Sequence, residues 1–250
     1  MIHLRSPEEI EKIRNSCRIV SETLVALQEI IKPGVTTRQL DTEAEKIIRS
    51  KGADPAFKGL YGFPATLCAS VDDEVVHGIP SDTPLEEGQI VGLDVGAVTA
   101  GYYGDHARTF AVGRIDEDRQ KLIDRTRESL DLAIQAARLG GTVGDIGHAV
   151  QRHAEAAGYG IVRDLVGHGV GTRLHEEPQI PNYGEPGTGP VLQEGMCLAI
   201  EPMINMGSEK IFTKDDGWTV KTADGAPSAH FEHTIAITSN GPEVLTAYDA

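Results

Sequence analysis

The feature of this sequence that most restricts its fold is an internal repeat. The segment Leu85–Asp94 carries Leu-x-Glu-Gly and ends in Leu-Asp, and Leu192–Glu201 carries the same pattern and ends in Ile-Glu, 107 residues later. Two similar helix openings, Gly34-Val35-Thr36 and Gly141-Thr142-Val143, lie at almost the same offset. Several matches in one order predict two duplicated halves packed about a pseudo-two-fold axis.

Each half begins with helices. Ser6-Pro7-Glu8-Glu9 is a capping box with proline at the first helical position, and apolar residues at helical spacing follow it as far as Pro33-Gly34. Three further helices are predicted, at Thr37–Ser50, about Glu117–Leu139 and about Val143–Ala157. Strands are predicted at Ala65–Val71, Ile90–Val95, Thr109–Val112, Cys197–Ile200 and Thr234–Thr238. We therefore predict a single catalytic domain over residues 1–250, with halves of approximately 1–113 and 114–250.

Composition excludes several classes of protein. The formal net charge is −15, which disfavours binding to nucleic-acid phosphates. Three cysteines without a CxxC pair argue against a disulfide framework and against a cysteine-ligated zinc site. No apolar run is long enough for a membrane span, and the N-terminus has no apolar signal-peptide core. We expect a reduced cytoplasmic protein that binds neither membranes nor nucleic acid directly.

The repeat brings acidic residues together. It places Asp94 opposite Glu201, and a further strand in each half carries an acid followed by histidine, at Asp105 and at Glu232. Alone, each acid could be an ordinary turn or surface residue. Four carboxylates meeting among apolar strands cannot all stay ionised without help, because burial and mutual repulsion both oppose their charge. Divalent cations would remove this conflict, as in two-metal hydrolases.

Three histidines lie in turns beside these strands. His168 has glycine on both sides and follows an apolar strand, His175 follows seven residues later, and His77 precedes Gly-Ile-Pro. We expect the glycines to let the backbone bend so that the imidazole approaches a bound group. The sequence contains no G-x-S-x-G, phosphate-loop, dinucleotide or H-E-x-x-H motif, so other common hydrolase and nucleotide-binding chemistries are disfavoured.

These residues together resemble the type I methionine aminopeptidases, in their minimal bacterial form. The resemblance is carried by the strings HGIP, GHGVGTRLHEEP, IEPM, DGWTVKT and FEHT and by the spacing of the acids, and it covers nearly the whole chain. It implies an α+β "pita-bread" fold, in which two αβ halves surround an antiparallel sheet. It also implies removal of the initiator methionine from nascent polypeptides by a monomeric enzyme, with the ribosome as a place to meet them.

The resemblance also implies roles for individual residues. Asp105 and Glu232 would bridge two divalent ions (Co, Mn, Fe or Zn), Asp94 would complete one ion, and His168 with Glu201 would complete the other. Glu201 would also move the proton of the attacking water, His175 would donate to the scissile carbonyl, and His77 would contact the scissile amide. The methionine pocket would consist of Leu60, Phe63, Cys68, Leu174 and Trp218. His106 and His230 depart from the residues usual in this family.

Two alternatives stay open at this point. Proline-specific relatives, such as prolidase or aminopeptidase P, share the metal ligands but normally carry an N-terminal domain, for which the first helix at Ser6 leaves no room. Relatives that have lost their metals and act as binding proteins usually lose ligands and gain basic extensions. This chain keeps every ligand and is acidic, so the methionine-specific enzyme is favoured.

Overall fold

Helix boundaries follow the capping signals in the sequence. The computed structural model describes residues 1–247, so the last three positions of the predicted second half lie outside the described residues. The helices are α1 (Pro7–Gln28), α2 (Thr37–Ser50), α3 (Glu117–Ala136) and α4 (Val143–Ala156). The predicted box at α1 is present, because Ser6 Oγ accepts from the Glu9 N–H at 3.3 Å and Glu9 accepts from the Ser6 N–H at 2.9 Å. None of the helices within residues 1–247 combines the length and apolarity of a membrane span.

The strands form one large sheet and two small ones. The large sheet has nine strands in the order β1-β4-β5-β14-β9-β7-β8, with β2 paired to β4 and β15 paired to β14, and its ladders are antiparallel. Its members are β1 (Asp54–Pro55), β2 (Leu67–Val71), β4 (Ile90–Thr99), β5 (Tyr102–Ala111), β7 (Gly167–Gly169), β8 (Glu176–Ile180), β9 (Cys197–Ile200), β14 (Glu232–Thr238) and β15 (Gly241–Val244). The small sheets contain β3 (Glu74–Val76), β6 (Gly160–Ile161), β10 (Met203–Asn205), β11 (Ile211–Thr213), β12 (Val220–Thr222) and β13 (Ser228–His230). A short 3-10 turn, η1, covers Leu60–Gly62.

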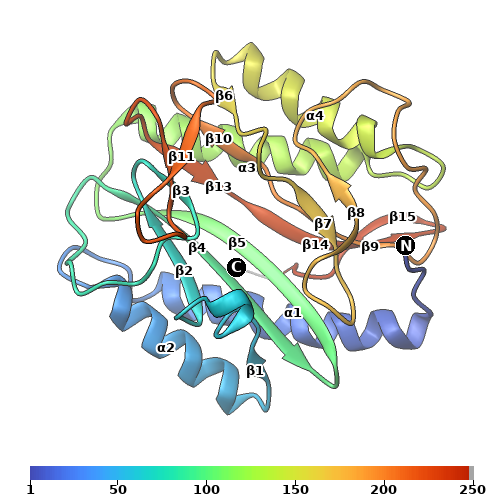
Figure 1. Ribbon diagram of the computed structural model, residues 1–250, viewed down its shortest axis with the longest axis horizontal. Helices are drawn as coiled ribbons and strands as arrows, with labels where there is room; N and C mark the ends of the chain where they lie inside the picture. The colour runs from blue at the N-terminus through green and yellow to red at the C-terminus, as the bar shows by residue number, and fades with distance from the viewer. Residues whose placement is uncertain (248–250) are drawn as a thin grey trace.

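The hydrogen bonds repeat between the halves. Gly34 N–H donates to the Leu85 carbonyl at 2.8 Å, and Gly140 N–H donates to the Leu192 carbonyl at 2.9 Å. Helices α2 and α4 both have 14 residues, and each begins with a capping box. Figure 1 shows α1 and α2 on one side of the sheet region and α3 and α4 on the opposite side. The structure is therefore an α+β fold with two related αβ halves around an antiparallel sheet, as predicted.

The acid–histidine pairs do not correspond as the repeat suggested. Gly88 N–H bonds to the Val112 carbonyl, and its counterpart Gly195 N–H bonds to the Ile237 carbonyl, which relates β5 to β14 at an offset of 125 residues. At that offset the residue of the first half that corresponds to Glu232 is Ala107 and not Asp105. Ala107 is also the residue that pairs with Glu232 across β5 and β14. Glu232 and Asp105 are therefore diagonal neighbours on two adjacent strands. They still share one face, because residues two apart in a strand point the same way.

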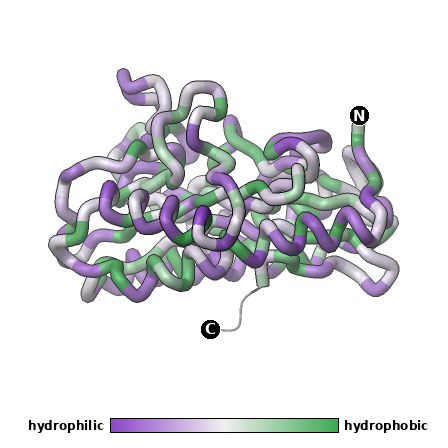
Figure 2. Tube along the Cα trace, turned by 90° about the horizontal axis from the view of Figure 1, so that it is seen from below, coloured by the Kyte–Doolittle hydropathy of each residue, from purple (hydrophilic) through white to green (hydrophobic). Residues whose placement is uncertain are grey.

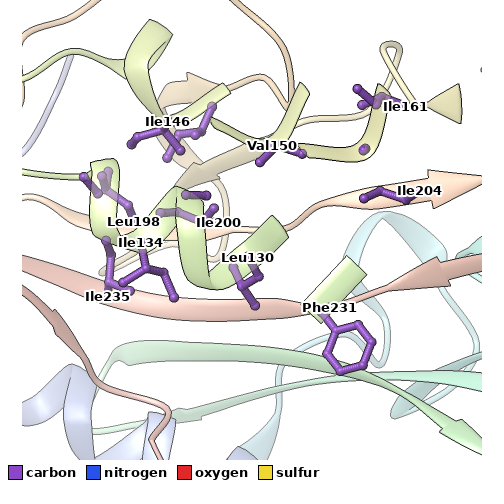
Figure 3. Close-up of a cluster of buried hydrophobic side chains, with 14 of the residues drawn as sticks. Leu130, Ile134, Ile146, Val150, Ile161, Leu198, Ile200, Ile204, Phe231 and Ile235 are labelled. Atoms are coloured by element: carbon purple, nitrogen blue, oxygen red, sulfur yellow. The ribbon is translucent and has the colours of Figure 1, made fainter. Parts of the chain in front are cut away.

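Two apolar layers separate the helices from the sheet. The first cluster joins α3 and α4 to β9 and β14, and Figure 3 shows Leu130 and Ile134 of α3 near Ile235 of β14. The second cluster joins α1 and α2 to β2 and β4. Helical turns in Figure 2 alternate between hydrophilic and hydrophobic colours, as expected for helices that bury one face. The helices thus stabilise the sheet, and the sheet holds the polar residues described next.

The start of β5 and the end of α3 are among several element ends that the sequence placed incorrectly. β5 begins at Tyr102, seven residues before the predicted Thr109, because its first part carries polar and charged side chains that hide the strand pattern. α3 ends at Ala136 rather than near Leu139, because Gly140 already pairs with Leu192 and the chain must leave the helix to reach it. The first error matters for the site, since β5 carries Asp105.

Candidate metal centre and substrate pocket

Strand register brings the five predicted metal ligands to one face of the large sheet. Asp94 pairs with Ala107 across β4 and β5, and Ala107 pairs with Glu232 across β5 and β14. Paired residues of antiparallel strands project to the same face, so these acids converge. His168 pairs with Ala199, which precedes Glu201 by two residues and so marks the same face.

The side chains of these residues meet in space. One ligand atom each from Asp105, His168 and Glu232 lie within 4.8 Å of one another. His168 Nε2 lies 3.5 Å from Glu201 Oε1 and 3.8 Å from Asp105 Oδ2. Asp94 lines the same pocket as the other four residues. The arrangement is a compact cluster of four carboxylates and one imidazole.

Burial makes this cluster unfavourable without cations. Burial, with repulsion from neighbouring acids, raises the pKa of Asp94, of Glu201 and of Glu232 well above its usual range. Burial also raises the pKa of Asp105 to about 7. Buried carboxylate oxygens of Asp94, Asp105 and Glu232 have no hydrogen-bond partner among the described residues. Buried carboxylate oxygens without partners in one pocket fit divalent cations, because hydrolases hold such ions between carboxylates.

His168 is oriented as a metal ligand would be. Its Nδ1 lies 2.9 Å from the Gly169 carbonyl oxygen, so the proton on Nδ1 is donated there and the Nε2 lone pair points toward Asp105 and Glu201. Burial, with the nearby His175, lowers the pKa of His168 to about 4, which keeps the imidazole neutral. A neutral imidazole with a fixed tautomer is the form that binds metals.

The glycines around His168 act through close packing and not through bending as expected. A Cβ at Gly167 would lie 2.4 Å from the Ala199 carbonyl oxygen, and one at Gly169 would lie 2.3 Å from the Glu177 carbonyl oxygen. The backbone is extended there, because His168 is the centre of strand β7. The glycines let β8 and β9 approach His168 from both sides.

An apolar pocket adjoins the acids. Phe63, Cys68 and Trp218 line one end of the pocket that also holds the acids, and this whole pocket, with His77 at its side, has a volume of about 140 Å³. Leu174 is 4% exposed and belongs to the same apolar cluster as Leu60, Phe63, Cys68 and Trp218. The Phe63 and Trp218 rings meet edge to face, with centroids 5.2 Å apart. All five predicted pocket residues therefore gather beside the acids.

Histidines 77 and 175 stand at the border between the acids and this pocket. The His175 ring meets the His168 ring edge to face, with centroids 4.5 Å apart. Burial lowers the pKa of His77, helped by His175, and partial burial lowers the pKa of His175, so both rings are neutral near pH 7. His77 has φ of 58°, a conformation uncommon outside glycine. Strain of this kind is found where a side chain is held for function.

Two residues of the site were not predicted from the sequence. Phe57 and Tyr61 line the pocket, and the Tyr61 ring stacks on His175 with centroids 6.4 Å apart. His230 Nε2 lies 3.7 Å from Glu201 Oε2, and burial with the nearby His77 lowers the pKa of His230 to about 3. The sequence marked His230 only as a departure from the family; it shares the face of Glu232 because it precedes that residue by two positions. The two aromatic residues lie on a loop whose path no periodicity fixes.

Known proteins resemble this chain over nearly its whole length. The profile described as "Metallopeptidase family M24" matches residues 11–239. A methionine aminopeptidase of Clostridium perfringens is 51% identical, covering 98% of this chain and 99% of that protein. The crystal structure of a Thermotoga maritima methionine aminopeptidase superposes with a TM-score of 0.98 at 47% identity, covering 99% of this chain and 100% of that chain.

Proline-specific relatives are more distant. A prolidase from Pyrococcus furiosus superposes with a TM-score of 0.80 at 28% identity, and the match covers 99% of this chain but 66% of the prolidase chain. These likenesses also bear out the predicted pita-bread fold. The buried acids, the fold and the near-complete match to curated relatives lead to one conclusion: this chain belongs to the methionine aminopeptidases of metallopeptidase family M24.

Proposed function

We propose that this chain removes the N-terminal methionine from nascent proteins and peptides, with a preference for a small second residue. The observation that carries the proposal is a single pocket in which four carboxylates and His168 lie beside apolar side chains, with Asp105 and Glu232 buried. An aminopeptidase needs both parts at one place, because the side chain of the first residue must lie beside the peptide bond that breaks.

The proposal assigns two divalent ions to the cluster. Asp94, Asp105, His168, Glu201 and Glu232 would hold them. Carboxylates with a single imidazole suit Mn, Fe or Co at least as well as Zn. Bound ions of this kind lower the pKa of water and polarise a carbonyl oxygen.

The residues of the chain supply the proton transfers and the orientation. Glu201 would accept a proton from the attacking water at its carboxylate and return it to the leaving amine. His175 would donate a hydrogen bond to the scissile carbonyl oxygen and to the oxyanion that replaces it. His77 would contact the scissile amide nitrogen. Asp94 would lie beside the free α-amine of the substrate.

The pocket accounts for the first residue of the substrate. Methionine is unbranched and flexible, and its sulfur makes favourable contacts with aromatic rings such as Phe63 and Trp218. Valine and isoleucine are stiff at χ1 and should fit a narrow slot poorly. One methylene is worth about 1–3 kcal/mol, so norleucine should be rejected weakly and alanine or lysine strongly. A small second residue is expected, because His77 and the rim leave little space beyond the first.

The proposal also covers the partners of the protein and its cellular compartment. The proposed partners are nascent polypeptide N-termini in the cytoplasm, met at the ribosome by a monomeric enzyme that does not bind nucleic acid or membranes directly. The three free cysteines, Cys17, Cys68 and Cys197, are all buried, which is consistent with a reducing compartment.

A peptide series tests the proposed specificity. Met-Xaa-Ser peptides with Xaa from glycine and alanine to isoleucine and lysine should be cleaved at rates that fall as Xaa grows. Ala-Ala-Ser and Ala-Pro-Ser serve as controls for the first residue and for proline specificity. Fast cleavage of Ala-Pro-Ser without cleavage of Met-Ala-Ser would replace the proposal with a proline-specific activity.

A further inference from the structure

The N-terminal segment contacts the loop that carries His175. Ile2 forms an isolated parallel bridge with Glu177, and the Arg5 N–H donates to the Gly195 carbonyl at 2.8 Å. Figure 1 shows the N-terminus beside β9. These two segments are adjacent in space although they are far apart in the sequence. The first residues of the chain therefore contact the second half of the molecule next to the site.

The main contact is a buried ion pair. Arg5 Nη2 donates a hydrogen bond to Glu176 Oε2, and the two side chains are 6% and 2% exposed. The other oxygen, Glu176 Oε1, accepts from the Thr172 hydroxyl at 3.2 Å and from the Arg173 N–H at 3.0 Å. Burial alone would raise the pKa of Glu176, but these hydrogen bonds lower it below its usual range. One ionised carboxylate thus ties the His175 loop to Arg5.

The loop packs directly against the guanidinium group. A Cβ at Gly171 would lie 2.2 Å from Arg5 Nη2, so only glycine leaves room for Arg5 at this point. The Gly171 carbonyl is fixed from the other side, where it accepts from the Tyr103 N–H at 2.8 Å. The loop is therefore anchored at Gly171, at Thr172 and at Glu176.

The anchoring matters because His175 has little else to hold it. Its imidazole makes no hydrogen bond within residues 1–247, and the His175 ring contacts the rings of His168 and of the exposed Tyr61. The position of the imidazole depends on the loop backbone, and Glu176 is its immediate neighbour in the chain.

We propose that Arg5 is a positioning residue for the reaction. Through Glu176 it holds the loop from Gly171 to Glu176, and so it sets where the His175 imidazole points. The inference rests on the proposed function, which makes His175 the donor to the scissile carbonyl. The N-terminal segment that precedes α1 then helps to position a residue of the active site.

A double-mutant cycle tests the proposal. Arg5→Ala should lower kcat for Met-Ala-Ser by about 10–100-fold with little change in KM or metal content, as expected when a catalytic group is displaced. His175→Ala alone should lower kcat by about 10²–10³-fold. In the His175→Ala protein the further change Arg5→Ala should have no effect, because Arg5 acts through His175. Arg5→Lys should restore part of the rate, since lysine keeps the charge without the planar fork.

The control is Arg14→Ala. Arg14 lies on α1 and pairs with Glu11 at 3.0 Å and Glu243 at 2.8 Å, away from the loop, so its loss should leave kcat unchanged. An equal loss of rate from Arg5→Ala with and without His175 would overturn the proposal, because Arg5 would then support the fold in general. An unchanged kcat in Arg5→Ala would overturn it too.

The NMR signal of the His175 imidazole reports the position of the ring independently of catalysis, so it tests the role of Arg5 even if the proposed function is wrong. The His175 signal, identified by its loss in His175→Ala, should shift or broaden in Arg5→Ala and recover in Arg5→Lys. An unmoved signal would overturn the positioning role even if His175 proved dispensable for catalysis. If Arg5→Ala did not fold, Thr172→Ala would replace it, since this removes one loop hydrogen bond and should lower kcat several-fold.

Discussion

Single residues carried most of the information about this site. The repeat and the family resemblance predicted the candidate ligands, and the structure brings their side chains together in one pocket. Contacts that depend on how a loop folds back were not found. The stacking of Tyr61 on His175 and the anchoring of Glu176 by Arg5 are of this second kind.

Removing one of the acids proposed to hold the metal should remove the metal and the activity together. Asp105→Asn or Glu232→Gln would leave the remaining buried acids facing each other with less positive charge between them. Elemental analysis of metal per chain, with cleavage of Met-Ala-Ser, would measure both effects. Asp118→Asn on the exposed start of α3 is the matched control and should change neither. Full activity with two bound ions in either site variant would show that the assignment is wrong.

At the scale of elements, the sequence predicted helices better than strands. Helices α2 and α4 follow from capping boxes and regular apolar spacing, whereas the polar first half of β5 has no apolar alternation. The site itself explains the difference, because the residues that serve function replace the residues that would have signalled a strand. Pairing of β5 with β14 is a long-range contact that only the folded chain reveals.

Two strand glycines give a matched test of how α1 packs on the sheet. A Cβ at Gly104 in β5 would lie 2.5 Å from the Cys17 backbone nitrogen in α1, whereas a Cβ at Gly92 in β4 would meet its nearest neighbour at 3.6 Å. Gly104→Ala should therefore lower the free energy of unfolding by about 1–3 kcal/mol, as overpacking does. Gly92→Ala should leave it nearly unchanged. Denaturant unfolding of both variants measures the difference, and equal stability would contradict this packing.

At the scale of the whole molecule, duplication places opposing halves around one charged centre. In the metal-free protein the clustered acids lower the stability of the fold, because burial and mutual repulsion oppose their charge. Bound cations should remove this destabilisation. The number of ions does not follow from the fold alone, because the same acids could share protons when no metal is bound. The repeat correctly related Asp94 to Glu201 but not Asp105 to Glu232, and it did not predict how the charges are balanced.

The stability of the metal-free protein should depend on pH in a specific direction. The pKa of Asp105 is raised to about 7 from an ordinary value of 3.8, so the folded state binds its proton more tightly than the unfolded state does. The stability this provides is complete below about pH 4 and is lost as pH rises through about 7. The melting temperature of chelated protein, relative to that of metal-loaded protein, should fall across this window. A constant difference would contradict the raised pKa.

Metal titration tests the central claim most directly. Protein stripped by a chelator would receive measured amounts of Mn²⁺ while bound metal and cleavage of Met-Ala-Ser are followed together. We predict no cleavage by the stripped protein, recovery of cleavage as metal binds, and saturation of the site at two ions per chain. Cleavage at the full rate by protein that holds no metal would contradict the account.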